Sequence, residues 1–113
     1  MAGTCDRIVN NAPLGKHVLK VSSADSDVVV GGARSVNEVE VETWTHDQLF
    51  NVPKEFTVKK GERHQLLVFG TFPARSTATV TVVVTKNDVP VAPACTLTRK
   101  GNTMAAIEVL AAL

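Results

Sequence analysis

The sequence predicts an all-β fold, a single-domain antiparallel β-sandwich of about seven short strands. Threonine and valine alternate over much of residues 76–85, and this period of two is typical of a half-buried strand. Similar short segments recur between groups of Gly, Pro, Asn and Asp that favour turns. The length suits one core, so residues 1–113 are expected to form one domain. This strand spacing indicates an immunoglobulin-like sandwich or a jelly roll.

The first third of the chain contains two predicted strands. Residues 5–15 end in Asn, Pro and Gly, so a loop is expected there. Residues 17–23 form a strand, and residues 24–27 form a turn because short polar side chains bond to their own backbone. A short buried strand follows at residues 28–30, and Gly31-Gly32 is expected to end it.

A second alternation covers residues 36–45. One side of this predicted strand carries valine and threonine, and the other carries three glutamates with Trp44 and is expected to face water. The glutamates are Glu38, Glu40 and Glu42. Residues 46–53 break the pattern and form a connection, with one helical turn for which Asp47 is the expected N-cap.

The second half of the chain supplies further strands at residues 55–59, 63–72, 76–85 and 94–98. Residues 66–69 are apolar on both faces, which indicates a central strand covered on both sides. The segment 89–93 is expected to be an extended connection, because proline cannot donate a sheet hydrogen bond. Residues 103–113 have helical spacing in part, but their place after a hairpin turn favours a strand through about residue 110.

Composition argues against several classes of function. A formal net charge of +1 gives no long-range field for nucleic acid or an anionic membrane, and 4% aromatic residues disfavour a sugar- or base-stacking surface. No apolar run has the length of a membrane span, and the chain as given contains no signal peptide, so the cytoplasm or an assembled particle is the expected location, with a mature secreted form as the alternative. No catalytic or cofactor motif is present, so neither an enzyme nor a cofactor is expected.

Cys5 and Cys95 leave two alternatives open. A disulfide between them would close a loop of nearly the whole domain and contribute about 4 to 5 kcal/mol in an oxidising compartment. The missing signal peptide favours two unpaired thiols in the cytosol instead.

The histidines show no spacing typical of a metal site. His17, His46 and His64 form no His-x-His pair, and no Cys-x-x-Cys accompanies them. Cys95 and Met104 are residue types found in blue-copper sites, but no histidine lies between them. We therefore predict no metal and expect histidines in exposed strand and loop positions.

Two loops contain the candidate ligand-binding residues. Trp44, His46 and Asp47 combine an aromatic wall with an imidazole that a carboxylate could orient, although a helix cap beside a surface histidine explains them better. Asp25 and Asp27 place two carboxylates in one turn, but a calcium loop normally supplies more oxygen ligands. A solvated turn is the favoured interpretation.

Protein contacts are predicted on the threonine-rich strand and at the C-terminus. Thr77, Thr79, Thr81 and Thr85 form a flat, uncharged face that Val83 interrupts, and Leu113 ends an apolar tail. The glutamate row and a basic group either pair across neighbouring strands or, on separate edges, contribute to contacts between copies. The basic group consists of Lys54, Lys59, Lys60 and Arg63.

The expected function is therefore that of a non-enzymatic β-sandwich module. It would assemble into a homo-oligomer or bind another protein, as a structural part of a particle, coat or fibre. A lectin-like module that binds a small ligand or carbohydrate through the loops near Trp44 is the alternative.

Overall fold

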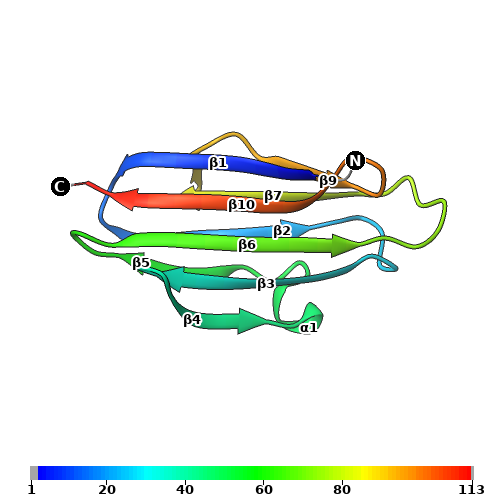
Figure 1. Ribbon diagram of the computed structural model, residues 1–113, viewed down its shortest axis with the longest axis horizontal. Coiled ribbons are helices and arrows are strands. Elements are labelled where there is room, and N and C mark those ends of the chain that lie inside the picture. The colour runs from blue at the N-terminus through cyan, green and yellow to red at the C-terminus, as the bar shows by residue number, and fades with distance from the viewer. Residues whose placement is uncertain (1–2, 113) are drawn as a thin grey trace.

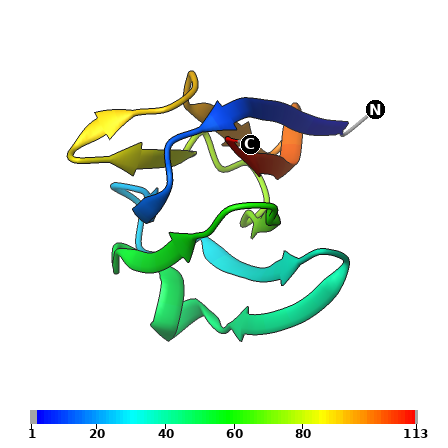
Figure 2. The same cartoon turned by 90° about the vertical axis from the view of Figure 1, so that its left-hand side faces the viewer.

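The computed structural model describes residues 3–112 and confirms the all-β class. Two sheets pack as a sandwich, which Figures 1 and 2 show from two sides. The chain forms ten strands rather than about seven: β1 (Gly3–Ala12), β2 (Gly15–Ser22), β3 (Val29–Val36), β4 (Val39–Trp44), β5 (Lys54–Val58), β6 (Arg63–Thr71), β7 (Thr79–Lys86), β8 (Val89–Pro90), β9 (Cys95–Thr98) and β10 (Asn102–Ala111). Within residues 3–112 the only helix is α1 (His46–Leu49), and no helix there is long and apolar enough to cross a membrane.

The first sheet, sheet A, has the strand order β1-β10-β6-β3-β4. The second, sheet B, has the order β5-β2-β7, and both β8 and β9 pair with the far edge of β7. All neighbours are antiparallel except β1 and β10. Connections such as β1 to β2 and β6 to β7 cross between the sheets, whereas β3 and β4 form a hairpin within sheet A.

The core lies between the sheets and is built from alternate strand positions. Val80, Val82 and Val84 of β7 are buried, as the alternation predicts. Leu66 and Val68 of β6 supply the equivalent inward positions in sheet A. Each such aliphatic side chain stabilises the fold by about 1.5 to 3 kcal/mol when fully buried.

The predicted loop at residues 5–15 is wrong, because most of it is strand β1. Cys5, Val9 and Ala12 are buried at inward positions, with polar residues between them. The strand is an edge of sheet A, paired only with β10, so its outward side accepts polar residues that weaken the apolar alternation. Gly15, with φ 116°, marks the bend into β2.

Gly31 and Gly32 do not end a strand, since β3 runs through both. A Cβ atom on Gly31 would lie 2.5 Å from the ring of Phe69, and one on Gly32 would lie 2.6 Å from the carbonyl oxygen of Leu67. Glycine here allows close packing against β6 instead of a turn.

The alternation at residues 36–45 crosses a hairpin turn that the pattern did not reveal. Asn37 and Glu38 have φ values of 49° and 71°, the left-handed conformation of a two-residue hairpin turn. The β3–β4 pairing also shifts register after Arg34, so that Glu42 and Trp44 lie on the inner side of sheet A. The prediction of one continuous strand whose three glutamates all face water is therefore wrong.

Strand β6 is covered on one side only, which corrects the expectation of a central strand buried on both sides. Leu66 and Val68 are fully buried, but Leu67 and Phe69 are 45% and 50% exposed. The C-terminal segment is the strand β10, as expected. The segment 89–93 also contains the short strand β8.

A disulfide joins Cys5 of β1 to Cys95 of β9, with 5.8 Å between the Cα atoms. The expectation of two free thiols is therefore wrong in this structure. Cys95 alternates with Leu97 in β9, and both are buried, which places the sulfur between the sheets. Because β1 is an edge of sheet A and β9 pairs at the edge of sheet B, the bond links the two sheets.

Candidate functional site

The outer side of sheet A carries large apolar side chains that remain exposed. Ile8 of β1, Val29 of β3, and Leu67 and Phe69 of β6 are 45 to 61% exposed. In register between them lie small or flexible residues, namely Gly31, Ala33, Met104 and Ala106. We call this surface the apolar face. A continuous apolar area of this kind typically marks an interaction site.

Part of the apolar face is a shallow hollow of about 400 Å³. Leu67, Phe69 and Met104 line it together with Ala33, Thr43 and Trp44. The Phe69 ring lies over Gly31, where a Cβ atom would collide with it. The β3 glycine therefore sets the position of the most prominent side chain of the face.

The predicted threonine surface lies on the outer side of sheet B. Thr79 is exposed, and Thr81 and Val83 are half-buried, at alternate positions of β7. Thr85, at the next alternate position, is buried, so its expected place on an exposed face is wrong. The register neighbours of Thr79, Thr81 and Val83 extend the surface, and we call the whole set the threonine face: Thr79, Thr81, Val83, Lys20, Ser22, Thr96 and Thr98. Thr77 precedes β7 in a loop, and Leu113 lies outside the described residues.

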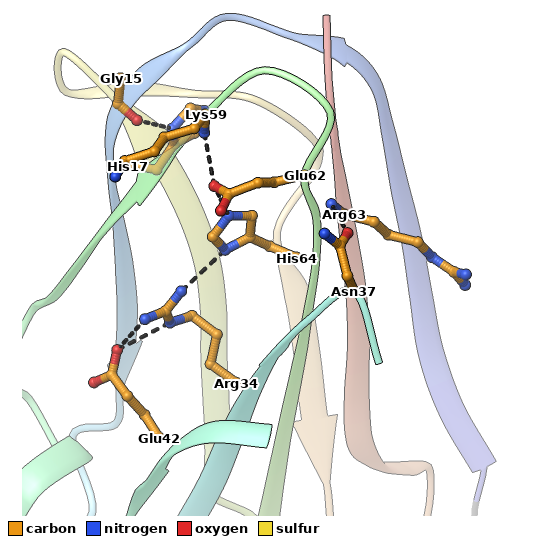
Figure 3. A network of polar contacts seen from close by, with 9 residues as sticks. All are labelled: Gly15, His17, Arg34, Asn37, Glu42, Lys59, Glu62, Arg63 and His64. Atoms are coloured by element: carbon orange, nitrogen blue, oxygen red, sulfur yellow. Dashed lines mark hydrogen bonds and ion pairs between the residues drawn. The ribbon is translucent and has the colours of Figure 1, made fainter. Parts of the chain in front are cut away.

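A chain of polar contacts lies between the sheets near β5 (Figure 3). His64 is 1% exposed, with Nε2 3.1 Å from Oε1 of Glu62 and Nδ1 3.0 Å from Nη1 of Arg34. Because a guanidinium only donates, Nδ1 accepts from Arg34, and Nε2 donates to Glu62. Arg34 also donates from Nε and Nη2 to Oε1 of Glu42. The hydrogen bond from His64, followed by that from the Lys59 amide, lowers the pKa of Glu62.

The ring of Phe56 in β5 connects this network to sheet B. It lies 5.3 Å from the His64 ring and 5.6 Å from the His17 ring, and the Arg34 guanidinium carbon is 5.6 Å from its centroid. These contacts combine aromatic packing with a cation–π interaction. Phe56, His64 and Arg34 therefore connect β5 to sheet A, and each polar group of Arg34 and His64 already has a protein partner.

The buried positions of His17 and His64 correct the expectation of exposed histidines. His17 alternates with Leu19 and Val21, and His64 alternates with Leu66 and Val68. Those inward positions were the sequence signal that could have identified both residues.

His17 is held neutral inside the sandwich. Its Nδ1 donates to the carbonyl oxygen of Gly15 at 3.1 Å, and its Nε2 is buried without a hydrogen-bond partner within residues 3–112. Burial lowers the pKa of His17, the hydrogen bond to the Gly15 carbonyl opposes this, and the charge of Lys86 lowers it further.

We expect this lowered pKa to make the protein less stable in mild acid. Below the usual pKa of 6.5 the unfolded chain binds a proton at His17 that the native state excludes. The free energy of unfolding should therefore rise with pH up to about 6.5, by at most about 1.4 kcal/mol per pH unit from this group. Urea titrations between pH 5 and 8 check this, and a His17→Phe variant should lose that part of the slope. An identical slope in the variant would contradict the assignment.

One ion pair joins the acidic and basic rows, with 3.8 Å between Nη1 of Arg63 in β6 and Oε1 of Glu38. Other members of the two rows lie on the edges of different sheets. Glu40 is in β4, at the edge of sheet A, whereas Lys54 is in β5, at the edge of sheet B. A cleft of about 580 Å³ separates them, with Arg34, Phe56 and His64 in its lining. In this cleft Lys16 pairs with Glu55 at 3.5 Å, and Arg34 pairs with Glu42. Because these charges neutralise each other, the cleft has little net charge with which to bind an ionic ligand.

The loop candidates around Trp44 are held by contacts within the fold, and Trp44 also lines the hollow of the apolar face. Trp44 is 8% exposed, and Nδ1 of His46 accepts from the Val30 amide at 3.1 Å. Thr45, not Asp47, is the N-cap of α1, and its amide donates to Gln48 at 2.9 Å. Asp47 lies in the first turn, where its charge favours the helix.

Asp25 and Asp27 form a hydrogen-bonded turn. The amide of Asp27 donates to Oδ1 of Asp25 at 2.8 Å, the arrangement expected of a solvated turn. Within residues 3–112 no group of three His, Cys, Asp or Glu side chains is arranged to hold a metal.

The chain matches no protein-family model, no curated protein and no solved structure.

Proposed function

We propose that this protein is a non-enzymatic β-sandwich module that assembles with copies of itself, as a structural component of a particle, coat or fibre. The exposed Leu67 and Phe69 side chains at the centre of the apolar face carry this proposal. Ile8 and Val29 lie on the same sheet face. When another molecule covers this face, each Å² of apolar surface removed from water contributes about 25 cal/mol to binding.

The other surfaces give the lectin-like alternative less support. A sugar-binding loop normally exposes an aromatic ring, whereas Trp44 is buried and His46 is bonded to the backbone of β3. The polar network of Arg34 and His64 has its partners within the fold and includes no nucleophile.

We also propose that the sandwich is immunoglobulin-like or a jelly roll. Both have two mainly antiparallel sheets with connections that cross from one sheet to the other. The β1–β2 and β6–β7 connections are of this type.

Light scattering coupled to size exclusion tests self-assembly. We expect a mass above that of one chain that rises with concentration, and we expect Leu67→Lys to lower it toward the monomer. Leu14→Lys is the matched control, because Leu14 is 47% exposed, against 45% for Leu67, but lies in the β1–β2 turn. A wild-type protein that stays monomeric at high concentration, or equal effects of the two variants, would count against the proposal.

A further inference from the structure

The apolar face has an excess of negative charge. Asp6, Glu40 and Glu108 occupy outward positions of β1, β4 and β10. Arg63 neutralises Glu108, with 2.5 Å between Nη2 and Oε1. Asp6 and Glu40 belong to none of the ion pairs among residues 3–112.

The threonine face has the opposite sign. Lys20 lies beside Val83 on the outer side of sheet B and belongs to no ion pair within the described chain. Lys16, four residues earlier on the same side of β2, is paired with Glu55. The remaining side chains of the face are mainly uncharged threonines, which can lie against an apolar surface while they keep hydrogen bonds at its rim.

Charge distinguishes two ways of covering the apolar face with a second copy. If two apolar faces met, the symmetry would bring Asp6 and Glu40 of both copies into one interface, and like charges in an interface are unfavourable. If the apolar face met the threonine face, one of these carboxylates could approach Lys20 of the neighbour, since Asp6 and Glu40 lie at opposite edges of sheet A. The second arrangement therefore covers the apolar side chains and gives one of the two carboxylates a cationic partner.

The two faces also match in size. In sheet B, β2 and β7 have eight residues each, β5 has five, and β8 and β9 share the fourth strand position with two and four. At about 4.8 Å between strands and about 3.3 Å per residue, this gives a face of about 430 Å². Sheet A has five strands and can cover that area. Two such faces cover about 860 Å² together, the size of a weak interface that assembles at high protein concentration.

We propose that copies of this protein join head to tail, with the apolar face of one copy on the threonine face of the next. This inference rests on the proposed function, and it names the second surface and the polarity of the assembly. Each copy then uses one face of each kind. Contacts between unlike faces generate a closed ring or an open fibre instead of a symmetric dimer.

Two variants, each with one face blocked, test this arrangement. Leu67→Lys adds a positive charge to the apolar face, and Lys20→Glu places a carboxylate on the threonine face. For each variant alone, the protein concentration at which half of the molecules are assembled should be at least tenfold higher than for the wild type. Lys60→Glu, in the β5–β6 turn, is the control for charge reversal and should assemble like the wild type. Unfolding midpoints close to that of the wild type confirm that both variants are folded.

The decisive measurement is the mass of the two variants mixed in equal amounts. Head-to-tail contact predicts a complex of twice the monomer mass, because each variant keeps the face that the other has lost. If the wild type assembles but Lys20→Glu assembles equally well, or if the mixture stays monomeric, the head-to-tail arrangement is wrong while self-assembly stands. A monomeric wild type would instead overturn the proposed function itself.

Discussion

Reduction of the Cys5–Cys95 disulfide is expected to lower the free energy of unfolding by about 4 kcal/mol. The bond joins residues 90 positions apart, so in the oxidised protein it restricts most of the unfolded chain. It also joins edge strand β1 of sheet A to β9 of sheet B, and this contact holds one side of the sandwich together. Urea unfolding of the oxidised protein and of the same protein kept in a strong thiol reductant measures the difference.

A variant with both Cys5→Ala and Cys95→Ala separates the disulfide from other effects of the reductant. The reductant should leave the free energy of unfolding of this variant unchanged, and its stability should be close to that of the reduced wild type. A difference below about 1 kcal/mol between the oxidised and reduced wild type would show that the bond does not constrain the unfolded chain as the loop length predicts.

The buried side of a strand could be predicted from the sequence, because an alternation of apolar and polar residues indicates that one side of the strand is buried. The buried valines of β7 were predicted in this way, whereas β10 was predicted from its place after a hairpin turn. The two-residue turn at Asn37-Glu38 could not, because it preserves the alternation of glutamate and valine across the bend. The β1 edge was missed for the opposite reason, since polar residues on its outer side outnumber the apolar residues that mark a strand.

The candidate surfaces were only partly predictable. The threonine face follows from the composition of one strand, but the apolar face depends on what covers sheet A. The sequence of β6, apolar at consecutive positions, is equally compatible with a second layer or with an exposed face. Only the arrangement of the two sheets distinguishes these two alternatives. In the structure, Leu67 and Phe69 lie on the surface. The network of Arg34 and His64 depends on pairs from β3, β4 and β6 that no sequence spacing reveals.

That network is the second place where a single change should have a large effect. Arg34→Ala is expected to lower the free energy of unfolding by about 3 kcal/mol, since it leaves the buried Nδ1 of His64 without a hydrogen-bond donor and removes the packing of a largely buried side chain. The Arg34 side chain is only 13% exposed and binds both Glu42 and the buried His64. Its loss also removes the cation above the Phe56 ring, which fastens β5 to sheet A.

Arg63→Ala provides a matched control within the same sheet. Arg63 also binds a glutamate, Glu108, but its side chain is 42% exposed, so water replaces the lost contact and the expected cost is below about 1 kcal/mol. Urea unfolding of both variants at pH 7 measures the difference between a buried and an exposed pair. If Arg34→Ala costs no more than Arg63→Ala, the network does not hold the β5 side of the sandwich. If Arg34→Ala costs about 3 kcal/mol, two separate contacts hold the two sheets together. One is the disulfide between β1 and β9. The other is the cluster of Arg34 in β3, His64 in β6 and Phe56 in β5.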